Sequence, residues 1–261
     1  MLPLALGNTK LKEKLPELLF NLASADRLAL LGEIATKRQT LTDLSKAINA
    51  SRPECSRHLA RLKKTGLITK DSDGLYQTTA VGTAILEILP SLQFLLEHRD
   101  NLLRYDLSQL PLPFLERIGE LSGGDYVDHF SLMLELIKKV ISTGREHVWV
   151  LSDKPVIVGS SPGAAFSSRD IPARLITGAN VDHKVVNEAK SVLRHGEFAT
   201  LPQVKVAVAM NESLAWVCFA GPDGKIDFGG GFSGKDAQFR GWCSDLFEYY
   251  WARAKRIYTP F

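Results

Sequence analysis

The first third of the chain alternates apolar and polar residues at helical spacing. A helix is predicted over SADRLALLGEIATK, with Ser24 at the position of an N-cap. Its inward positions are Leu28, Leu31, Ile34 and Ala35. A second short helix is predicted near 41–48, and its inward positions are Leu41, Leu44 and Ile48. Both helices are therefore expected to be amphipathic.

A third helix is predicted in SRPECSRHLARLKKTG. Ser51 and Glu54 have the spacing of a capping box, and Pro53 lies in the first turn, where a missing N–H costs nothing. Gly66 ends the helix. The runs LITK and LYQTT follow, joined by DSDG, which favours a tight hairpin turn. This order of helices and hairpin is typical of a winged helix-turn-helix.

The third helix has two unlike faces at 100° per residue. Cys55, Leu59 and Leu62 form the inward stripe, which favours a core role for Cys55. His58 lies beside this stripe and is expected to be partly buried. The outer face has small side chains at its centre and basic side chains at its edges, as expected of a helix that lies in the DNA major groove. The predicted DNA-binding residues are Arg52, Pro53, Ser56, Arg57, Ala60, Arg61, Lys63, Lys64, Lys70 and Tyr76. A plain solvated basic face is the alternative.

Residues 80–104 are rich in Leu and Ile, and Pro90 is expected to break or kink this run. The segment is a candidate for pairing in a homodimer, with packing on the chain's own second domain as the alternative. The stretch LSQLPLPF at 107–114 predicts a domain boundary. We therefore expect a DNA-binding domain over 1–80, a helical linker over 81–110 and a second domain over 111–261.

The second domain combines predicted helices with short apolar runs. The runs are HVWVL, PVIVG, ARLIT, VKVAVAM and LAWVCFA, and the helices lie near 127–144, 181–195 and 234–257. Such alternation predicts an α/β domain with a mixed sheet. The whole chain is therefore expected to be a two-domain α/β protein.

Composition and charge narrow the class of protein. The 261 residues are 45% hydrophobic and 23% charged, which indicates an ordinary globular protein. Neither a signal peptide nor a membrane span is predicted, and three widely spaced cysteines fit a reducing compartment, so we expect a cytoplasmic protein. The net charge is +3, yet residues 51–70 hold six basic residues and one acidic residue. That concentration favours a local phosphate-binding surface.

The sequence gives little support for catalysis or for a cofactor. No His is followed by Lys at the second position, so the H-x-K-x4-D site of phospholipase D is absent. Asp153, Asp182 and His183 could form an acid/base group, but capping is the commoner role in such contexts. No C-x-x-C or H-x-x-x-H motif that could hold zinc is present. We expect a protein that is not an enzyme and has no cofactor.

The segment GGGFSGKD at 229–236 matches two nucleotide-binding patterns. Too few residues follow it to build a phosphate-loop fold, and Asp follows Lys235 where Ser or Thr is needed. We interpret it as a strand-to-helix turn after a hairpin of LAWVCFA with KIDF, with Ser233 as N-cap. A small-molecule effector is expected beyond the carboxyl ends of strands. The candidate ligand-binding residues are Ser152, Asp153, Thr177, Asn180, Trp216, Phe228 and Gly230.

The first 80 residues resemble the ArsR-like winged helix-turn-helix of prokaryotic regulators, through SRPECSRHLARLKKTGLITKDSDGLYQTT. Residues 115–261 resemble the effector domain of an archaeal regulator family named for control of methanogenesis and filament growth. That resemblance rests on LERIGEL, RLIT and GWCSDLFEYYWARAKR. It implies a phospholipase-D-like, catalytically dead effector domain and a dimeric transcription factor that binds promoter DNA and a small molecule. The alternative function is an S-adenosylmethionine-dependent O-methyltransferase with a dimerising winged helix.

Overall fold

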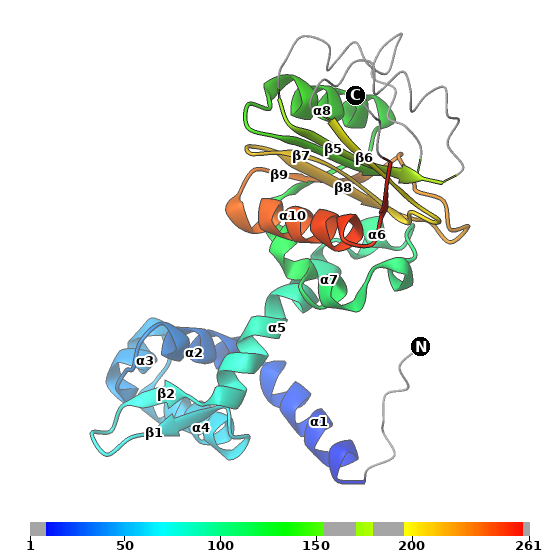
Figure 1. Cartoon of the computed structure of the whole chain (residues 1–261). Helices are drawn as coiled ribbons and strands as arrows, with labels where there is room; N and C mark the ends of the chain where they lie inside the picture. Colours follow the sequence, from blue (N-terminus) through cyan, green and yellow to red (C-terminus); the bar gives the residue numbers. More distant parts are fainter. Residues whose placement is uncertain (1–8, 154–170, 180–195, 258–261) are drawn as a thin grey trace. The chain divides into compact units, whose positions relative to one another are not determined.

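The computed structural model describes the backbone of residues 9–153, 171–179 and 196–257 (Figure 1). The chain divides into two compact units, Met1–Leu89 and Pro90–Phe261. Each unit has its own hydrophobic core. The expectation of two domains agrees with this division, and each unit is described by itself below.

The boundary between the units falls inside α5 (Ala80–Glu97), before the proline-rich stretch at 107–114 where we expected it. Leu110 and Phe114 of that stretch are buried in the core of the second unit. The prolines therefore shape a packed segment of the second unit and do not form a linker.

The first unit holds helices followed by a two-stranded hairpin. Its elements before α5 are α1 (Thr9–Leu22), α2 (Ala25–Thr36), α3 (Leu41–Ala47), α4 (Arg52–Lys64), β1 (Ile68–Lys70) and β2 (Tyr76–Thr78). The strands are antiparallel, with Ile68 opposite Thr78 and Lys70 opposite Tyr76. The predicted winged helix-turn-helix is confirmed.

Local signals fix the ends of these helices. Ser51 accepts a hydrogen bond from the Glu54 N–H at 3.4 Å, which is one of the two bonds of the predicted capping box. Gly66 follows α4 with a φ of 75°, a left-handed conformation that favours glycine. Ser24 occupies the N-cap of α2, but its side chain makes no capping hydrogen bond.

The inward face of α2 differs from the prediction at two positions, because Leu28 and Ala35 are both exposed. Leu28 is 37% exposed, whereas Leu30, Leu31 and Ile34 are buried. Arg27 occupies part of the inward face, because its guanidinium donates hydrogen bonds to the carbonyls of Asn21 and Phe20. The charged side chain of Arg27 is therefore buried on a face of α2 where the hydrophobic periodicity predicted apolar residues.

α5 continues through Pro90, where we expected a break or kink. Pro90 has no N–H, so the backbone carbonyl one turn earlier in the helix receives no hydrogen bond from it. Because Pro90 is exposed, water can hydrogen-bond to that carbonyl instead. The next residue, Ser91, is buried. Its hydroxyl donates to the Glu116 carbonyl at 2.7 Å and accepts from the Gly119 N–H at 3.1 Å. These bonds fix the second half of α5 to the second unit.

The second unit contains helices around one large sheet. After α5, its helical elements are α6 (Arg99–Leu102), η1 (Leu107–Gln109), α7 (Leu112–Glu116), η2 (Ile118–Gly123), α8 (Phe130–Thr143) and α10 (Ala237–Trp251). Its strands are β3 (Asp125–Val127), β4 (Val148–Ser152), β5 (Ala173–Gly178), β6 (Gly196–Leu201), β7 (Val206–Asn211), β8 (Ala215–Phe219), β9 (Gly231–Gly234) and β10 (Lys255–Arg256).

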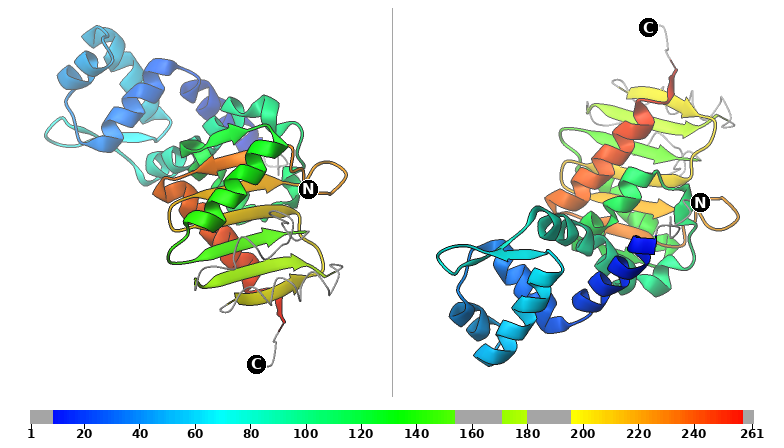
Figure 2. Two further views of the ribbon diagram at one scale, coloured as in Figure 1. Left: turned by 90° about the horizontal axis from the view of Figure 1, so that it is seen from above. Right: turned by 90° about the horizontal axis from the view of Figure 1, so that it is seen from below.

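The strands form one mixed sheet in the order β10-β6-β5-β4-β7-β8-β9-β3. β4, β5 and β6 are mutually parallel, and the other pairings are antiparallel. α8 covers one face of the sheet and α10 covers the other, as Figures 1 and 2 show. Ile137 of α8 and Trp242 of α10 are almost fully buried. The predicted mixed-sheet α/β domain is confirmed.

The glycine segment differs from the prediction. Gly231–Gly234 is itself a strand, β9, which pairs with both β8 and β3. The expected strand KIDF forms only an isolated bridge between Ala220 and Ile226. Asp236, not Ser233, caps α10, and its carboxylate accepts the N–H groups of Gln238 and Phe239. Because it pairs with a strand on each side, this segment forms a strand instead of the predicted turn.

The predicted strand at 155–159 and the predicted helix at 181–195 lie outside the described residues. β3, β6 and β10 were not predicted. β3 and β10 are short edge strands, and β6 carries too little apolar alternation to be distinguished from a loop.

Two helical glycines give a matched test of the first unit. A Cβ on Gly82 would collide with the Leu67 backbone, whereas a Cβ on Gly32 would meet nothing within 4 Å. We expect Gly82→Ala to destabilise the protein by about 1–3 kcal/mol and Gly32→Ala to stabilise it by up to about 1 kcal/mol. Denaturant unfolding monitored by circular dichroism measures both effects. Equal effects of the two changes would contradict the packing of α5 against the hairpin.

Candidate functional site

The two faces of α4 are as the sequence predicted. Cys55, Leu59 and Leu62 are 0–1% exposed and belong to the core of the first unit. The opposite residues are exposed. They are Arg52, Pro53, Ser56, Arg57, Ala60, Arg61, Lys63 and Lys64. We call these eight residues the outer face. It combines small side chains with five basic ones.

Lys64 of the outer face and Lys70 of the hairpin have partners within the chain. Lys64 makes an ion pair with Glu17 of α1, with 3.1 Å between Nζ and the carboxylate oxygen. Lys70 of the hairpin is exposed, and its ammonium lies 5.3 Å from the centre of the Tyr76 ring. The Lys64 side chain is 78% exposed, so its ion pair with Glu17 is weakly stabilising and can be exchanged for another anion.

Tyr76 does not lie on the surface where we expected it. Its side chain is 8% exposed and packs in the core of the first unit. In β2 the residue faces the helices, because β-strand side chains alternate between the two sides and Tyr76 falls on the inner one. Of the two hairpin residues, Lys70 alone remains a candidate for contact with DNA.

His58 and Cys55 lie where the helix pattern placed them. His58 is partly buried, and its Nε2 is 3.6 Å from the Asp26 carboxylate. Burial raises the pKa of the Cys55 thiol, and it raises the pKa values of Cys218 and Cys243 further. A thiol with a raised pKa is mostly protonated and unreactive near neutral pH.

The candidate effector residues fall into two groups on the sheet. Ser152 and Thr177 lie opposite each other at the carboxyl ends of the parallel strands β4 and β5, and Asp153 follows directly. Ser152 is 2% exposed. The Thr177 hydroxyl is buried, and no described residue provides it with a hydrogen-bond partner. Asn180 lies outside the described residues.

The second group surrounds β8, which β7 separates from β4. Trp216 is 1% exposed and stacks on Phe228, with 6.4 Å between ring centres. The indole N–H of Trp216 is buried without a partner among the described residues. Buried polar groups in proteins are nearly always hydrogen-bonded, so each such group requires an explanation.

Gly230 has a packing role. A Cβ at this position would collide with the Tyr126 hydroxyl and closely approach the Tyr105 hydroxyl and the Arg104 guanidinium. Arg104 donates to Asp227 at 2.7 Å and to the Tyr126 oxygen at 3.2 Å. This group of Arg104, Tyr126 and Asp227 was not anticipated, because its members are distant in the sequence. It explains a glycine in GGGFSGKD without a nucleotide.

Two sequence candidates for catalysis lie outside the described residues. They are Asp182 and His183. Residues 159–163, GSSPG, match the pattern G-x-S-x-G, and they too lie outside that part of the chain. The pattern indicates a nucleophile only at a strand-to-helix turn.

The comparisons with known proteins add a family match for the first unit. The family described as HVO_A0261 N-terminal domain matches residues 16–100, less than half of the chain. This segment contains the winged helix-turn-helix and α5. No curated protein matches the chain.

Several solved structures are similar to parts or most of the chain. TrmBL2, described as an archaeal chromatin protein with a novel mode of DNA binding, is 12% identical, with 95% of this chain and 97% of that chain covered and a TM-score of 0.42. The homodimeric winged helix-turn-helix DNA-binding domain of Mb0332 from Mycobacterium bovis is 20% identical, with 38% and 93% covered and a TM-score of 0.32. NucT from Helicobacter pylori is 11% identical, with 51% and 98% covered and a TM-score of 0.42. Each TM-score is below 0.5, so these similarities do not by themselves assign a function.

The three thiols allow a direct check of the two cores. Cys55, Cys218 and Cys243 are all buried with raised pKa values. We expect an aromatic disulfide reagent at pH 8 to label none of them in the native protein and all three in denaturant. Rapid labelling of one thiol in the native protein would show that its core is open.

Proposed function

We propose that the chain is a DNA-binding transcription regulator whose recognition helix is α4. The observation that carries the proposal is the outer face, which is exposed because three residues on the other side of α4 are fully buried. A helix enters the major groove when its exposed face has small residues at the centre and donors at the edges. α4 has both, and the hairpin follows it as a wing.

The residues of the outer face have separable roles in this proposal. Ser56 and Arg57 lie in the first half of α4, where the side chains of a recognition helix reach base edges. Arg61, Lys63 and Lys64 lie in the last turn and contact phosphates, as does Lys70 of the hairpin. Lys64 exchanges Glu17 for a phosphate on binding. Base contacts set sequence preference, and phosphate contacts set affinity.

We further propose that a small molecule bound in the second unit controls this binding, with no catalysis in that unit. Two buried polar groups support a ligand: the Thr177 hydroxyl and the Trp216 indole N–H lack partners among the described residues. Thr177 and Ser152 lie at the carboxyl ends of parallel strands, where ligands bind in α/β sheets. The absence of H-x-K-x4-D from the sequence supports the inactive phospholipase-D-like interpretation of this fold.

A homodimer completes the proposal, and α5 supplies the surface. Val81, Ile88, Leu92 and Leu96 are 49–76% exposed and lie along one stripe of the helix. A second copy of the chain would cover this stripe and would place two α4 helices on one duplex. Such a regulator would work in the cytoplasm.

The length and composition of α5 also satisfy the criterion for a membrane span, the only such case among the described residues. One helix of this kind is weak evidence for a membrane. Ile85 packs against the core of the first unit and Phe94 is buried in the core of the second. Because both halves of α5 pack into globular cores, we interpret its exposed stripe as a protein interface.

Two substitutions on the outer face separate base contacts from phosphate contacts. We expect Arg57→Ala to cost about 1–3 kcal/mol on the preferred site and to relax sequence preference. Lys64→Ala should weaken all duplexes alike and reduce the slope of log K against log salt by about 1. Anisotropy titrations with selected and random duplexes at several salt concentrations measure both. Equal loss of specificity from the two changes would contradict the assignment of the face.

The dimer surface has its own matched pair of variants. Leu92→Glu places a charge on the exposed stripe of α5, whereas Gln93→Glu places one on an exposed neighbour outside it. We expect light scattering after size exclusion to report a dimer for the parent and Gln93→Glu, and a monomer for Leu92→Glu, since burying an unpaired charge is costly. A monomeric parent chain would contradict the proposed dimer.

A further inference from the structure

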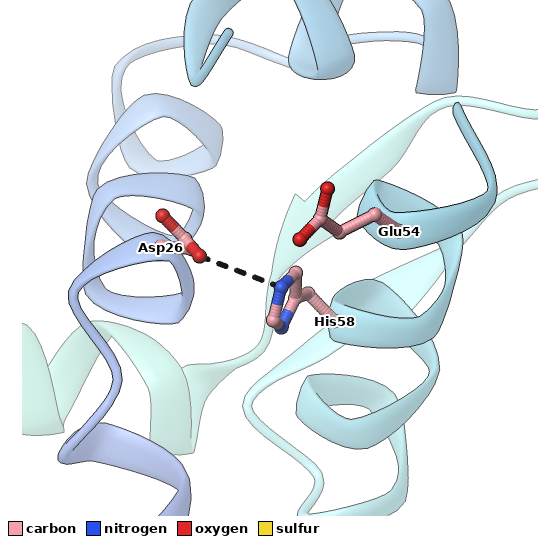
Figure 3. Close-up of side chains that lie close together, drawn as sticks. All are labelled: Asp26, Glu54 and His58. Carbon is pink, nitrogen blue, oxygen red and sulfur yellow. Dashed lines mark ion pairs between the residues drawn. The ribbon is translucent and has the colours of Figure 1, made fainter. Parts of the chain in front are cut away.

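Three side chains that can bind a metal ion meet between α2 and α4. Asp26 lies in the first turn of α2, and Glu54 and His58 lie one turn apart on α4 (Figure 3). One ligand atom from each residue lies within 4.8 Å of the other two. His58 Nε2 and Asp26 Oδ2 are 3.6 Å apart. The three residues face one another across the gap between the helices.

The packing of the first unit explains why they meet. Residues four apart on a helix lie on the same side, so Glu54 and His58 project together from α4. Leu30 and Leu31 of α2 and Leu59 of α4 are buried in the same core, which holds the start of α2 beside this side of α4. The position is open to ions, since the Asp26 side chain is 52% exposed and the His58 side chain is 18% exposed.

Asp26 and His58 bring one carboxylate and one imidazole to this point. Glu54 brings a second carboxylate to the same point, and it forms no ion pair with any described residue. Two carboxylates so close together repel each other unless a cation lies between them. A divalent cation would neutralise both and would accept the imidazole nitrogen as a third ligand.

We propose that Asp26, Glu54 and His58 bind one divalent first-row transition-metal ion, such as Zn²⁺. One imidazole nitrogen with two carboxylate oxygens suits Zn²⁺ better than Ca²⁺ or Mg²⁺, which prefer oxygen ligands alone. Bonds of about 2.0–2.2 Å place the ligand atoms of a tetrahedral site about 3.4 Å apart. The observed separations are 3.6 Å for the His58–Asp26 pair and at most 4.8 Å for the pairs with Glu54. Water supplies the fourth ligand.

The ion would join α2 to the recognition helix and would add two positive charges beside the outer face. Shared core packing and the Asp26–His58 contact join α4 to α2, and the ion would add a further link that stabilises the orientation of α4. If the chain binds DNA as proposed, the added charge also strengthens that binding. The site itself does not depend on the DNA proposal.

Calorimetric titration of the full chain with Zn²⁺, without DNA, tests the site. We expect one ion per chain, at least tenfold weaker binding in Asp26→Asn and His58→Gln, and no change in His129→Gln, which removes an exposed imidazole elsewhere. The three cysteines are buried and do not compete for the ion. Zn²⁺ should also raise the melting temperature of the parent but not of Asp26→Asn.

The absence of binding to the parent chain, or equal binding in all variants, would overturn the site. If the circular dichroism spectrum of Asp26→Asn or His58→Gln shows that the variant is unfolded, chemical modification of histidines in the parent chain tests the site instead. Zn²⁺ should then protect His58 from carbethoxylation and leave His129 reactive, and equal modification of both would overturn the site. If the parent chain binds Zn²⁺ but its affinity for DNA does not change, the metal site stands and the proposed effect of the ion on DNA binding is wrong.

Discussion

The burial of one stripe of α4 is the constraint on which the account of this protein depends. Cys55, Leu59 and Leu62 have almost no exposed surface, and each belongs to the core formed by α2, α3 and the hairpin. Rotation of α4 about its axis would expose these side chains at a cost of several kcal/mol. The helix is therefore fixed with its small and basic residues toward solvent. The orientation of the proposed recognition surface follows from hydrophobic packing alone.

The polar side chains of the second unit differ in burial and in partners, and the group around Gly230 lies partly at the surface, with the Arg104 side chain 40% exposed. Arg104, Tyr126 and Asp227 satisfy one another around Gly230, whose missing side chain gives them room. Thr177 and Trp216 contrast with this group, since their buried polar atoms lack partners among the described residues. Burying such an atom without a partner costs about 1–3 kcal/mol. A ligand that supplied the missing hydrogen bonds would recover that cost, which is the physical basis of the proposed effector control.

The sequence predicted what local signals determine and missed what distant contacts determine. The capping box at Ser51, the glycine at 66 and the periodicity of α4 are local, and they suffice to define the winged helix and its exposed face. Tyr76 and Leu28 were misplaced, since tertiary packing chooses which side of a short element is buried. β9 resembled a flexible turn because its pairing with β3 involves residues about a hundred positions away. The spacing of Glu54 and His58 was visible in the sequence, but their meeting with Asp26 required the fold.

Selection of genomic DNA by the full chain tests directly whether the outer face of α4 reads DNA. The affinity for a selected duplex and for a random duplex is then measured at physiological salt. We predict an inverted repeat with half-site centres about one helical turn apart, and a selected site bound at least about 10³-fold more tightly than random DNA. Recovery of no common sequence, with equal affinity for both duplexes, would contradict this prediction.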